Sequence, residues 1–227
     1  MIKSDYNKPL EKFKNIHSGE SAIIFATGPS INEYIPFEGS EECIKVGLNR
    51  IYVHEDISSD LDYYYFGSHY YVDETHKKNV DKICLRPTIP GDYNFTKFAS
   101  AYENGVSHGE INRGNISPED AIKIGAIPFE NNLEYFTNDV ANYSTLGHSI
   151  IFPPLQHILY MGVKIIYLVG CDGGRTDPAD FLEYGDTHLI GWWLKFKEFK
   201  DEYYKNVKII SINPVSLKGL FQDAIVE

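Results

Sequence analysis

The sequence predicts an α/β fold in which helices cover both faces of a mostly parallel sheet. Three observations predict it. Short runs of apolar, β-branched and aromatic residues recur along the chain, helix-like segments separate these runs, and the length of 227 residues suits one domain with one sizeable core. Near-continuous apolar runs are typical of parallel strands, because both faces of such a sheet are buried.

Six segments have the composition of buried strands. They are residues 21–26, 43–48, 62–66, 82–85, 164–169 and 207–212. Crossovers between parallel strands are right-handed, so strands that alternate with helices wind in both directions from the middle of a sheet. The expected arrangement is therefore a doubly wound, Rossmann-like sheet.

Two helices are signalled clearly. One begins at Pro153 and Pro154, since proline is tolerated in a first helical turn, and it ends at Gly162. The other follows Gly191, with large apolar side chains at spacings of four, three and four: Trp192, Phe196, Phe199 and Tyr203. That spacing predicts an amphipathic helix on the sheet, with Trp192 and the neighbouring Trp193 in the core.

Residues 90–142 are patterned weakly and are rich in Asn, Gly, Glu and Tyr. Ser117 is followed by Pro118 and then by acidic residues, which is typical of the start of a short helix. A long segment of this kind in a compact α/β domain is often a binding loop. We therefore expect a single domain over 1–227 with a lid-like insert at about 90–142.

The charge balance excludes some partners. Lys and Arg number 21 and Asp and Glu 32, a net charge of −11. Non-specific nucleic-acid binding and polybasic membrane attachment both need clustered cations, so neither is expected. The three cysteines, Cys43, Cys84 and Cys171, have no C-x-x-C spacing. With no stretch of signal-peptide or transmembrane type, these features favour a cytoplasmic protein without disulfides or structural zinc.

The first predicted strand runs into Thr27-Gly28-Pro29-Ser30. Ser30 and Glu33 have the spacing of a capping box at a helix start. Gly28 allows a ligand to approach the backbone closely, and free amides at a helix start bind phosphate at the carboxyl edge of such sheets. A plain tight turn with a good N-cap is the alternative interpretation.

Polar residues follow other predicted strands at the same edge. Asn49 follows the second strand, Ser68 the third, and Asp172 the strand that ends at Gly170. Because the carboxyl ends of parallel strands meet at one edge, we expect these residues to form one pocket with Gly28, Ser30, Ser149 and His188. No metal is expected. The eight histidines lack metal-site spacing, and Asp60-Leu61-Asp62 enters a strand rather than leaving one.

The order of these motifs resembles two related groups of bacterial enzymes, the single-domain sialyltransferases and the motility-accessory-factor glycosyltransferases. The shared features are strand–Gly-Pro-Ser–helix, an Asn after the second strand, and four later segments. These segments are residues 144–150, 161–172, 187–191 and 213–217. The resemblance spans most of the chain outside the insert.

The resemblance implies a metal-independent transferase that takes a sugar from a nucleotide donor, CMP-sialic acid in the first group. It implies that Gly28, Pro29 and Ser30 meet the donor phosphate or ribose. Asn49 would hydrogen-bond the nucleotide, and Ser149 would line the nucleotide pocket. Asp172 would lie under the donor.

The catalytic base departs from the family pattern. In the sialyltransferases it is the second histidine of His-x-Ile-Gly-His, and here His188 is followed by Trp192 in that second place. His188 is the first candidate base, because histidine titrates near neutrality, and His148 and His69 are reserves. Asp172 completes the candidate catalytic pair.

The sequence therefore favours a glycosyltransferase that needs no cofactor beyond its nucleotide-sugar substrate and that acts on a surface glycan acceptor, as a possible homo-oligomer. Two alternatives stay open. A pterin-diphosphokinase-like phosphotransferase shares the Gly-Pro-Ser and Gly-x-Asp framework but needs Mg²⁺ and more carboxylates. A nucleotide-binding protein without catalysis is the other, because Trp192 fills the place of the family histidine.

Overall fold

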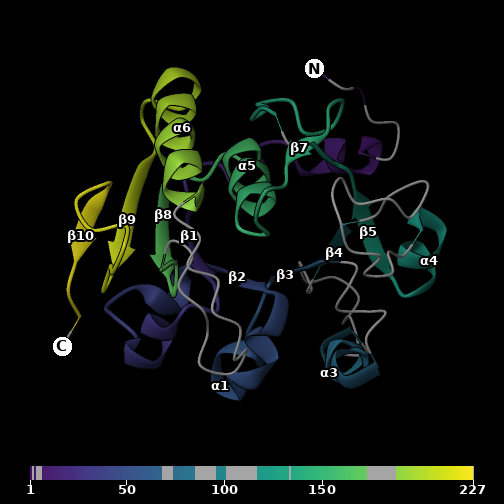
Figure 1. The fold of residues 1–227 in the computed structure, drawn as a ribbon, viewed down its shortest axis with the longest axis horizontal. Helices are drawn as coiled ribbons and strands as arrows, with labels where there is room; N and C mark the ends of the chain where they lie inside the picture. Colours follow the sequence, from purple (N-terminus) through teal and green to yellow (C-terminus); the bar gives the residue numbers. More distant parts are fainter. Residues whose placement is uncertain are drawn as a thin grey trace.

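The computed structural model describes residues 1, 3, 7–67, 74–84, 96–100, 117–132, 134–172 and 188–226. Within these ranges the main sheet has eight strands, all parallel, in the order β10-β9-β8-β1-β2-β3-β4-β5 (Figure 1). Their bounds are β1 (Ser21–Phe25), β2 (Ile44–Leu48), β3 (Tyr63–Phe66), β4 (Thr96–Ser100), β5 (Ala126–Phe129), β8 (Ile165–Val169), β9 (Lys208–Ile212) and β10 (Gln222–Ala224). The doubly wound, Rossmann-like α/β class is thus confirmed.

Helices cover both faces of this sheet (Figure 1). One face carries α5 (Phe152–Tyr160), α6 (His188–Tyr203) and the 3₁₀-helix η1 (Lys8–Phe13). The other carries α1 (Glu55–Ser58), α3 (Glu74–Cys84) and α4 (Pro118–Lys123), with three 3₁₀-helices: η2 (Pro29–Glu33), η3 (Ser40–Glu42) and η4 (Asn49–Val53). A second, two-stranded sheet pairs β6 (Asn131–Asn132) with β7 (Thr145–Leu146).

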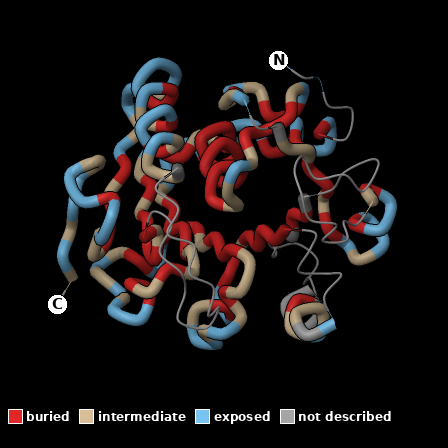
Figure 2. The backbone as a smooth tube through the Cα atoms, viewed as in Figure 1, coloured by how far each residue is buried: buried red, intermediate tan, exposed pale blue. Residues whose placement is uncertain are grey.

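Alternate residues of each strand pack into different cores. Ile24 of β1 lies in the cluster under α5 and α6, whereas its neighbours Ile23 and Phe25 lie in the cluster on the α1 face. Tyr65 and Tyr64 of β3 divide in the same way. Side chains of a strand point alternately to the two faces, so a run that is apolar throughout is buried on both sides, as Figure 2 shows for the sheet.

Five of the six predicted strands are confirmed, as are both predicted helices and the short helix capped by Ser117. The sixth strand, predicted at 82–85, is wrong: residues 82–84 are the last turn of α3. Val80 and Ile83 lie three positions apart among charged residues, which is helical spacing, and Val80 is fully buried. An apolar run of only three residues misled the strand prediction.

The stretch 90–142 contributes part of the main sheet. β4 and β5 lie within it: β4 pairs with β3, and β5 pairs with β4. α4, which lies between them in the chain, packs on the α1 face. Sequence pattern missed these strands because Thr96, Lys97 and Pro128 interrupt their apolar character. A lid built from the other residues of this stretch stays a prediction.

In the described part of the chain, no helix combines the length and apolar character needed to cross a bilayer.

Candidate active site

The strand order reverses between β8 and β1. From β1 the chain adds β2, β3, β4 and β5 on one side, whereas β8, β9 and β10 lie on the other. The connection after β1 leads to η2 on the α1 face, and α6, which follows β8, lies on the opposite face (Figure 1). Ligands of open α/β sheets bind outside the carboxyl ends of the strands at such a switch point. The carboxyl edge between β1 and β8 is called the crevice below.

Two side chains meet across this crevice. The Ser30 backbone N–H donates to Oδ2 of Asp172 at 2.8 Å, and the Ser30 hydroxyl donates to Oδ1 at 2.5 Å. Asp172 is 4% exposed and Ser30 6%. Both carboxylate oxygens therefore accept hydrogen bonds in a site that excludes most water, where a bond to a charged group is stronger than one between neutral groups.

Gly28 makes this meeting possible. Its N–H donates to the carbonyl of Gly170 at 2.8 Å. A Cβ at Gly28 would lie 2.5 Å from that carbonyl oxygen and 2.8 Å from Cγ of Asp172, closer than such contacts allow. Gly170 itself has a φ of 67°, a conformation that favours glycine. The loops after β1 and β8 can thus touch only with glycine at position 28.

The capping box predicted for Ser30 and Glu33 is absent from the structure. η2 is a 3₁₀-helix whose N-cap is Gly28, and no side chain caps it. The Ser30 side chain points to Asp172 instead, because the carboxylate accepts hydrogen bonds from both the hydroxyl and the backbone N–H of Ser30. The Ser30 amide, which we expected to meet phosphate, already has an acceptor within the protein.

Asn49 follows β2 at the same edge and has a φ of 42°. Its side-chain Oδ1 accepts from the backbone N–H of Gly67, just past β3, at 3.0 Å, and its carbonyl accepts from the Tyr64 hydroxyl at 2.6 Å. Asparagine tolerates a positive φ better than most residues. Asn49 therefore joins the ends of two strands through its oxygen atoms, and its side-chain amide still has two N–H donors to offer.

A buried glutamine fixes the N-terminal end of α5. Gln156 Oε1 accepts from the backbone N–H of Thr137 at 2.9 Å and of Leu146 at 3.3 Å. Its Nε2 donates to the carbonyls of Leu146 at 3.3 Å and Phe152 at 2.9 Å. The amide is fully buried and all its hydrogen-bonding capacity is used, so β7 and the first turn of α5 are held together. A lone Gln in an apolar helix was the signal in the sequence for this role.

The turn between β7 and α5 carries Ser149. Gly147 lies against the side chain of Asn131, where a Cβ would come within 2.4 Å of Asn131 Cγ. The Ser149 carbonyl accepts from the backbone N–H of Phe152 at 3.1 Å, and the Ser149 side chain is half-buried. Because α5 leads into the start of β8, its C-terminal end lies at the amino edge of the sheet and this turn toward the carboxyl edge.

An aromatic stack lies beside Ser149. The rings of His148 and Trp192 have centroids 4.1 Å apart and planes inclined by 27°. The Lys195 ammonium lies over the indole, 4.0 Å from its ring centroid. Trp193 is buried among Phe152, Phe196 and other apolar side chains, as predicted, but Trp192 is only half-buried. The stack therefore joins the turn before α5 to the first turns of α6.

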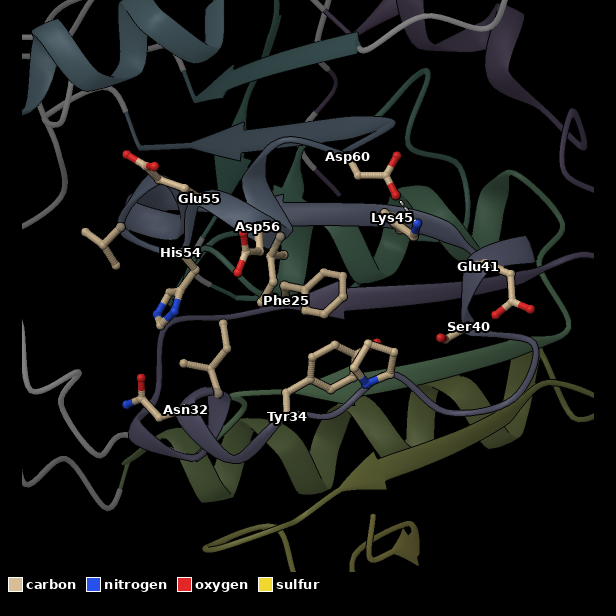
Figure 3. Close-up of a pocket in the computed structure, with 14 residues that line it drawn as sticks. Phe25, Asn32, Tyr34, Ser40, Glu41, Lys45, His54, Glu55, Asp56 and Asp60 are labelled. Atoms are coloured by element: carbon tan, nitrogen blue, oxygen red, sulfur yellow. Dashed lines mark hydrogen bonds and ion pairs between the residues drawn. The ribbon is translucent and has the colours of Figure 1, made fainter. Parts of the chain in front are cut away.

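Figure 3 shows a groove of about 690 Å³ on the α1 face, where the β1–β2 crossover has only short 3₁₀-helices to cover the sheet. Asn32 and His54 lie at its carboxyl-edge end and Lys45 at the other, with Phe25 between. Its lining includes four carboxylates: Glu41, Glu55, Asp56 and Asp60. The charge of Lys45 is engaged by Asp60. A surface this acidic repels phosphate, so the crevice between β1 and β8 fits an anionic ligand better than this groove does.

Neither the nearby thiol nor the Asp-Leu-Asp motif supplies obvious chemistry. Burial, with the Asp172 charge beside it, raises the pKa of the Cys171 thiol, which keeps it protonated and a poor nucleophile. Asp62 accepts from the backbone N–H of Lys45 at 2.8 Å at the amino edge, opposite the crevice, as its position in the sequence predicted. The described residues contain no cluster of three or more His, Cys, Asp or Glu side chains with metal-site geometry.

Several predicted site residues lie partly or wholly outside the described residues. Ser68 and the reserve base His69 fall outside them, and His188 is described only as the first residue of α6. The structure does bring Gly28, Ser30 and Asp172 together, and it places Asn49 and Ser149 toward the same edge.

No family model matches the chain, and a search of curated proteins found no match. Solved structures do resemble it. Against the monofunctional alpha-2,3-sialyltransferase Cst-I of Campylobacter jejuni the TM-score is 0.49, with 14% identity over 85% of this chain and 75% of that one. Against the sialyltransferase CstII of Campylobacter jejuni in complex with cytidine-5'-monophosphate it is 0.47, with 15% identity over 89% and 84%. The similarity is one of fold.

Proposed function

We propose that this chain is a metal-independent glycosyltransferase that takes a sugar from a CMP-type nucleotide donor and transfers it to a glycan acceptor. The observation that carries the proposal is the contact between Ser30 and Asp172. The two motifs that carry the sequence resemblance, Gly-Pro-Ser and Gly-Cys-Asp, lie far apart in the chain yet are hydrogen-bonded across the switch point of the sheet. A nucleotide phosphate in this crevice lies outside the carboxyl ends of β1 and β8.

We assign the predicted residues different roles. Gly28 and Pro29 shape the loop after β1 that faces the ligand, because their own backbone groups are bonded within the protein, and the Asn49 amide donates to the nucleotide. Ser149 lines the side of the nucleotide pocket that is formed by the turn before α5. Ser30 and Asp172 act on each other, so we assign them to holding the loop that meets the donor. Ser68 adds to the nucleotide pocket, and the base is a histidine at this edge, for which the sequence puts His188 first.

Glycosyl transfer without a metal needs two things from the protein. A base must accept the proton of the acceptor hydroxyl, and the leaving nucleotide phosphate must be stabilised as negative charge develops on it. Donors at the carboxyl edge supply the second, and the Asn49 side chain is the described group that fits it. The acidic groove does not supply the second, because its charge is the wrong sign for the phosphate.

The test has two stages. Calorimetry with CMP, UDP, GDP and ATP in the absence of divalent cations establishes the nucleotide, and we expect CMP to bind tightest. Release of CMP from CMP-sialic acid, followed with and without EDTA, then establishes turnover, which we expect EDTA to leave unchanged. Binding of none of the four nucleotides at millimolar concentration would refute the proposal. Mg²⁺-dependent consumption of ATP would favour the phosphotransferase, and CMP binding without turnover the non-catalytic alternative.

A further inference from the structure

The groove on the α1 face has an apolar floor (Figure 3). The rings of Phe25 and Tyr34 meet edge-on in its middle, with centroids 5.2 Å apart. Val53, at the end of η4, also lines the groove and is 41% exposed. The other apolar lining residues are Ile31, Pro36 and Ile57. An apolar hollow that opens to solvent and has a polar rim is typical of a surface that binds a partner.

Carboxylates form the rim of this groove, and three of them lack a cationic partner. Glu41, Glu55 and Asp56 are exposed and form no ion pair within the described part of the chain, whereas Asp60 pairs with Lys45. A neutral ligand that covered the three carboxylates would leave charges without water and without partners, which is strongly unfavourable. The charge of the rim therefore selects a cationic occupant.

The acidity of the whole chain is concentrated around this groove. Residues 29–62, which include β2 and all the helices that border it, hold eight Asp and Glu side chains but only two Lys and Arg side chains. More than half of the net charge of −11 thus comes from this one segment. A surface with such a concentration of one sign attracts a partner of the opposite sign and speeds its association.

The shape of the groove fits an extended chain. The groove runs alongside β1, from Asn32 and His54 at the carboxyl edge to Lys45 at the amino edge (Figure 3). β1 has five residues, and five extended residues span about 17 Å. The groove volume of about 690 Å³ leaves room for several side chains. An extended segment of about five residues therefore reaches from one end to the other.

The order of charges along the groove indicates which side chains such a segment carries. Asp56 lies on the carboxyl-edge side of the Phe25 ring and Glu41 on its amino-edge side (Figure 3). Alternate side chains of an extended chain point the same way, so the first, third and fifth residues of the segment face the groove. Basic side chains at the first and fifth positions then meet carboxylates, and an apolar side chain at the third meets the floor.

We propose that this groove is a docking site for a basic, extended segment of a partner protein. The segment has Lys or Arg at its first and fifth positions and an aromatic or large aliphatic residue at its third. The basic side chains pair with Asp56 and Glu41, and the apolar side chain packs on Phe25 and Tyr34. This interaction is separate from the proposed transferase activity, because none of these residues belongs to the crevice.

The first experiment varies the peptide. A fluorescein-labelled peptide, Gly-Lys-Ser-Phe-Ser-Lys-Gly, is titrated with the protein and followed by fluorescence anisotropy. We expect saturable binding that weakens as NaCl is raised from about 0.05 to about 0.5 M, because salt screens exposed charge pairs. Replacement of its Phe by Ala should weaken binding about tenfold, since a buried aromatic anchor supplies a large share of the binding energy. The reordered peptide Gly-Lys-Lys-Ser-Ser-Phe-Gly should also bind more weakly.

The second experiment varies the protein. Asp56→Asn and Glu41→Gln should each weaken peptide binding about two- to fivefold, as for the loss of one exposed ion pair. Val53→Lys, which places a positive charge at an exposed lining position, should weaken it more than either. Glu198→Gln is the matched control. It removes one exposed carboxylate from α6, on the opposite face of the sheet, and should leave the Kd unchanged.

Several results would overturn the proposal. Equal affinity for the reordered peptide, or equal weakening by Glu198→Gln, would show attraction to the overall negative charge and no docking in the groove. Absence of binding at about millimolar peptide would exclude the interaction. Displacement of the peptide by an equal concentration of spermidine would assign the groove to a small polyamine. All these measurements are made without nucleotide, so none of them affects the transferase proposal, which is tested with CMP.

Discussion

Ser30 and Asp172 lie 142 positions apart in the chain and are joined by two hydrogen bonds inside the crevice. The conformation of the loop after β1 therefore depends on hydrogen bonds to the loop after β8, and each loop stabilises the other. Burial of the Asp172 carboxylate depends on these donors, since a buried charge without partners is strongly unfavourable.

The first prediction follows from this pair. Ser30→Ala removes the shorter of the two bonds and should lower the free energy of unfolding by about 2 kcal/mol, as for a hydrogen bond to a charged group. Asp172→Asn should lower it by a similar amount. In the double variant the two losses should not add, with a coupling of about 1 kcal/mol or more measured by urea denaturation. Strict additivity would show that the two side chains do not stabilise each other.

The second prediction concerns Gly28. Gly28→Ala places a methyl group against the Gly170 carbonyl and the Asp172 carboxylate. We expect a loss of stability of about 1–3 kcal/mol, as for overpacking, together with weaker nucleotide binding. Gly191→Ala is the matched control, because a Cβ there meets nothing within 4 Å and the residue lies inside α6. That change should stabilise the protein by up to about 1 kcal/mol. Equal thermal shifts of the two variants would contradict this account.

The third prediction separates structure from binding at Asn49. Asn49→Asp keeps an oxygen for the Gly67 N–H and tolerates the positive φ, but it removes the two amide donors and adds negative charge. CMP affinity should fall about tenfold or more, equivalent to about 1.4 kcal/mol, while the melting temperature changes by only a few degrees. Asn49→Ala loses the strand-end bond as well and should destabilise the fold. Unchanged CMP affinity in Asn49→Asp would remove this residue from the nucleotide site.

The fourth prediction is a pH dependence of stability. His157 is fully buried among aromatic rings, with Nδ1 bonded to the Tyr65 hydroxyl at 3.0 Å and Nε2 without a partner among the described residues. Burial lowers its pKa from 6.5 to about 3. Below pH 6.5 the unfolded chain therefore binds a proton at this residue, whereas the folded protein binds it only near pH 3. The free energy of unfolding consequently decreases as the pH is lowered from 6.5 to about 3.

At pH 5 this group should account for a loss of about 2 kcal/mol relative to pH 8, because each pKa unit corresponds to about 1.4 kcal/mol. The measurement is urea denaturation at both pH values for the wild type and for His157→Gln. The variant lacks the titrating group, so its stability should decline by about 2 kcal/mol less over the same interval. An identical decline in both proteins would show that His157 does not carry the effect.

The fold could be predicted from the sequence wherever a segment that is buried in the structure is also apolar along its length. Residues 21–25 and 165–169 are apolar almost throughout because they lie at the centre of the sheet. β4 and β5 lie toward the edge and contain Lys97 and Pro128, so their composition does not identify them. Strand character is set there by the neighbouring strand rather than by the segment itself.

The site was predictable in location but not in its internal bonding. Strand-end positions were enough to bring Gly28, Asn49 and Asp172 to one edge, because parallel strands share their carboxyl ends. The capping box failed since Ser30 had a stronger partner that is distant in sequence and adjacent in space. The contact of Trp192 with His148 was beyond prediction for the same reason, since His148 lies in the turn before α5, Trp192 lies in α6, and no local pattern relates them.

The pairing of β1 with β8 has a consequence for synthesis of the chain. Ser21 pairs with Ile165, so the central strand of the sheet waits for a partner that is translated 144 residues later. At 5–20 residues per second this takes roughly 7–30 s. During that time one edge of Ser21–Phe25 is open to any other strand. We therefore expect chains that are stopped before residue 165 is added to be sensitive to protease in their N-terminal half.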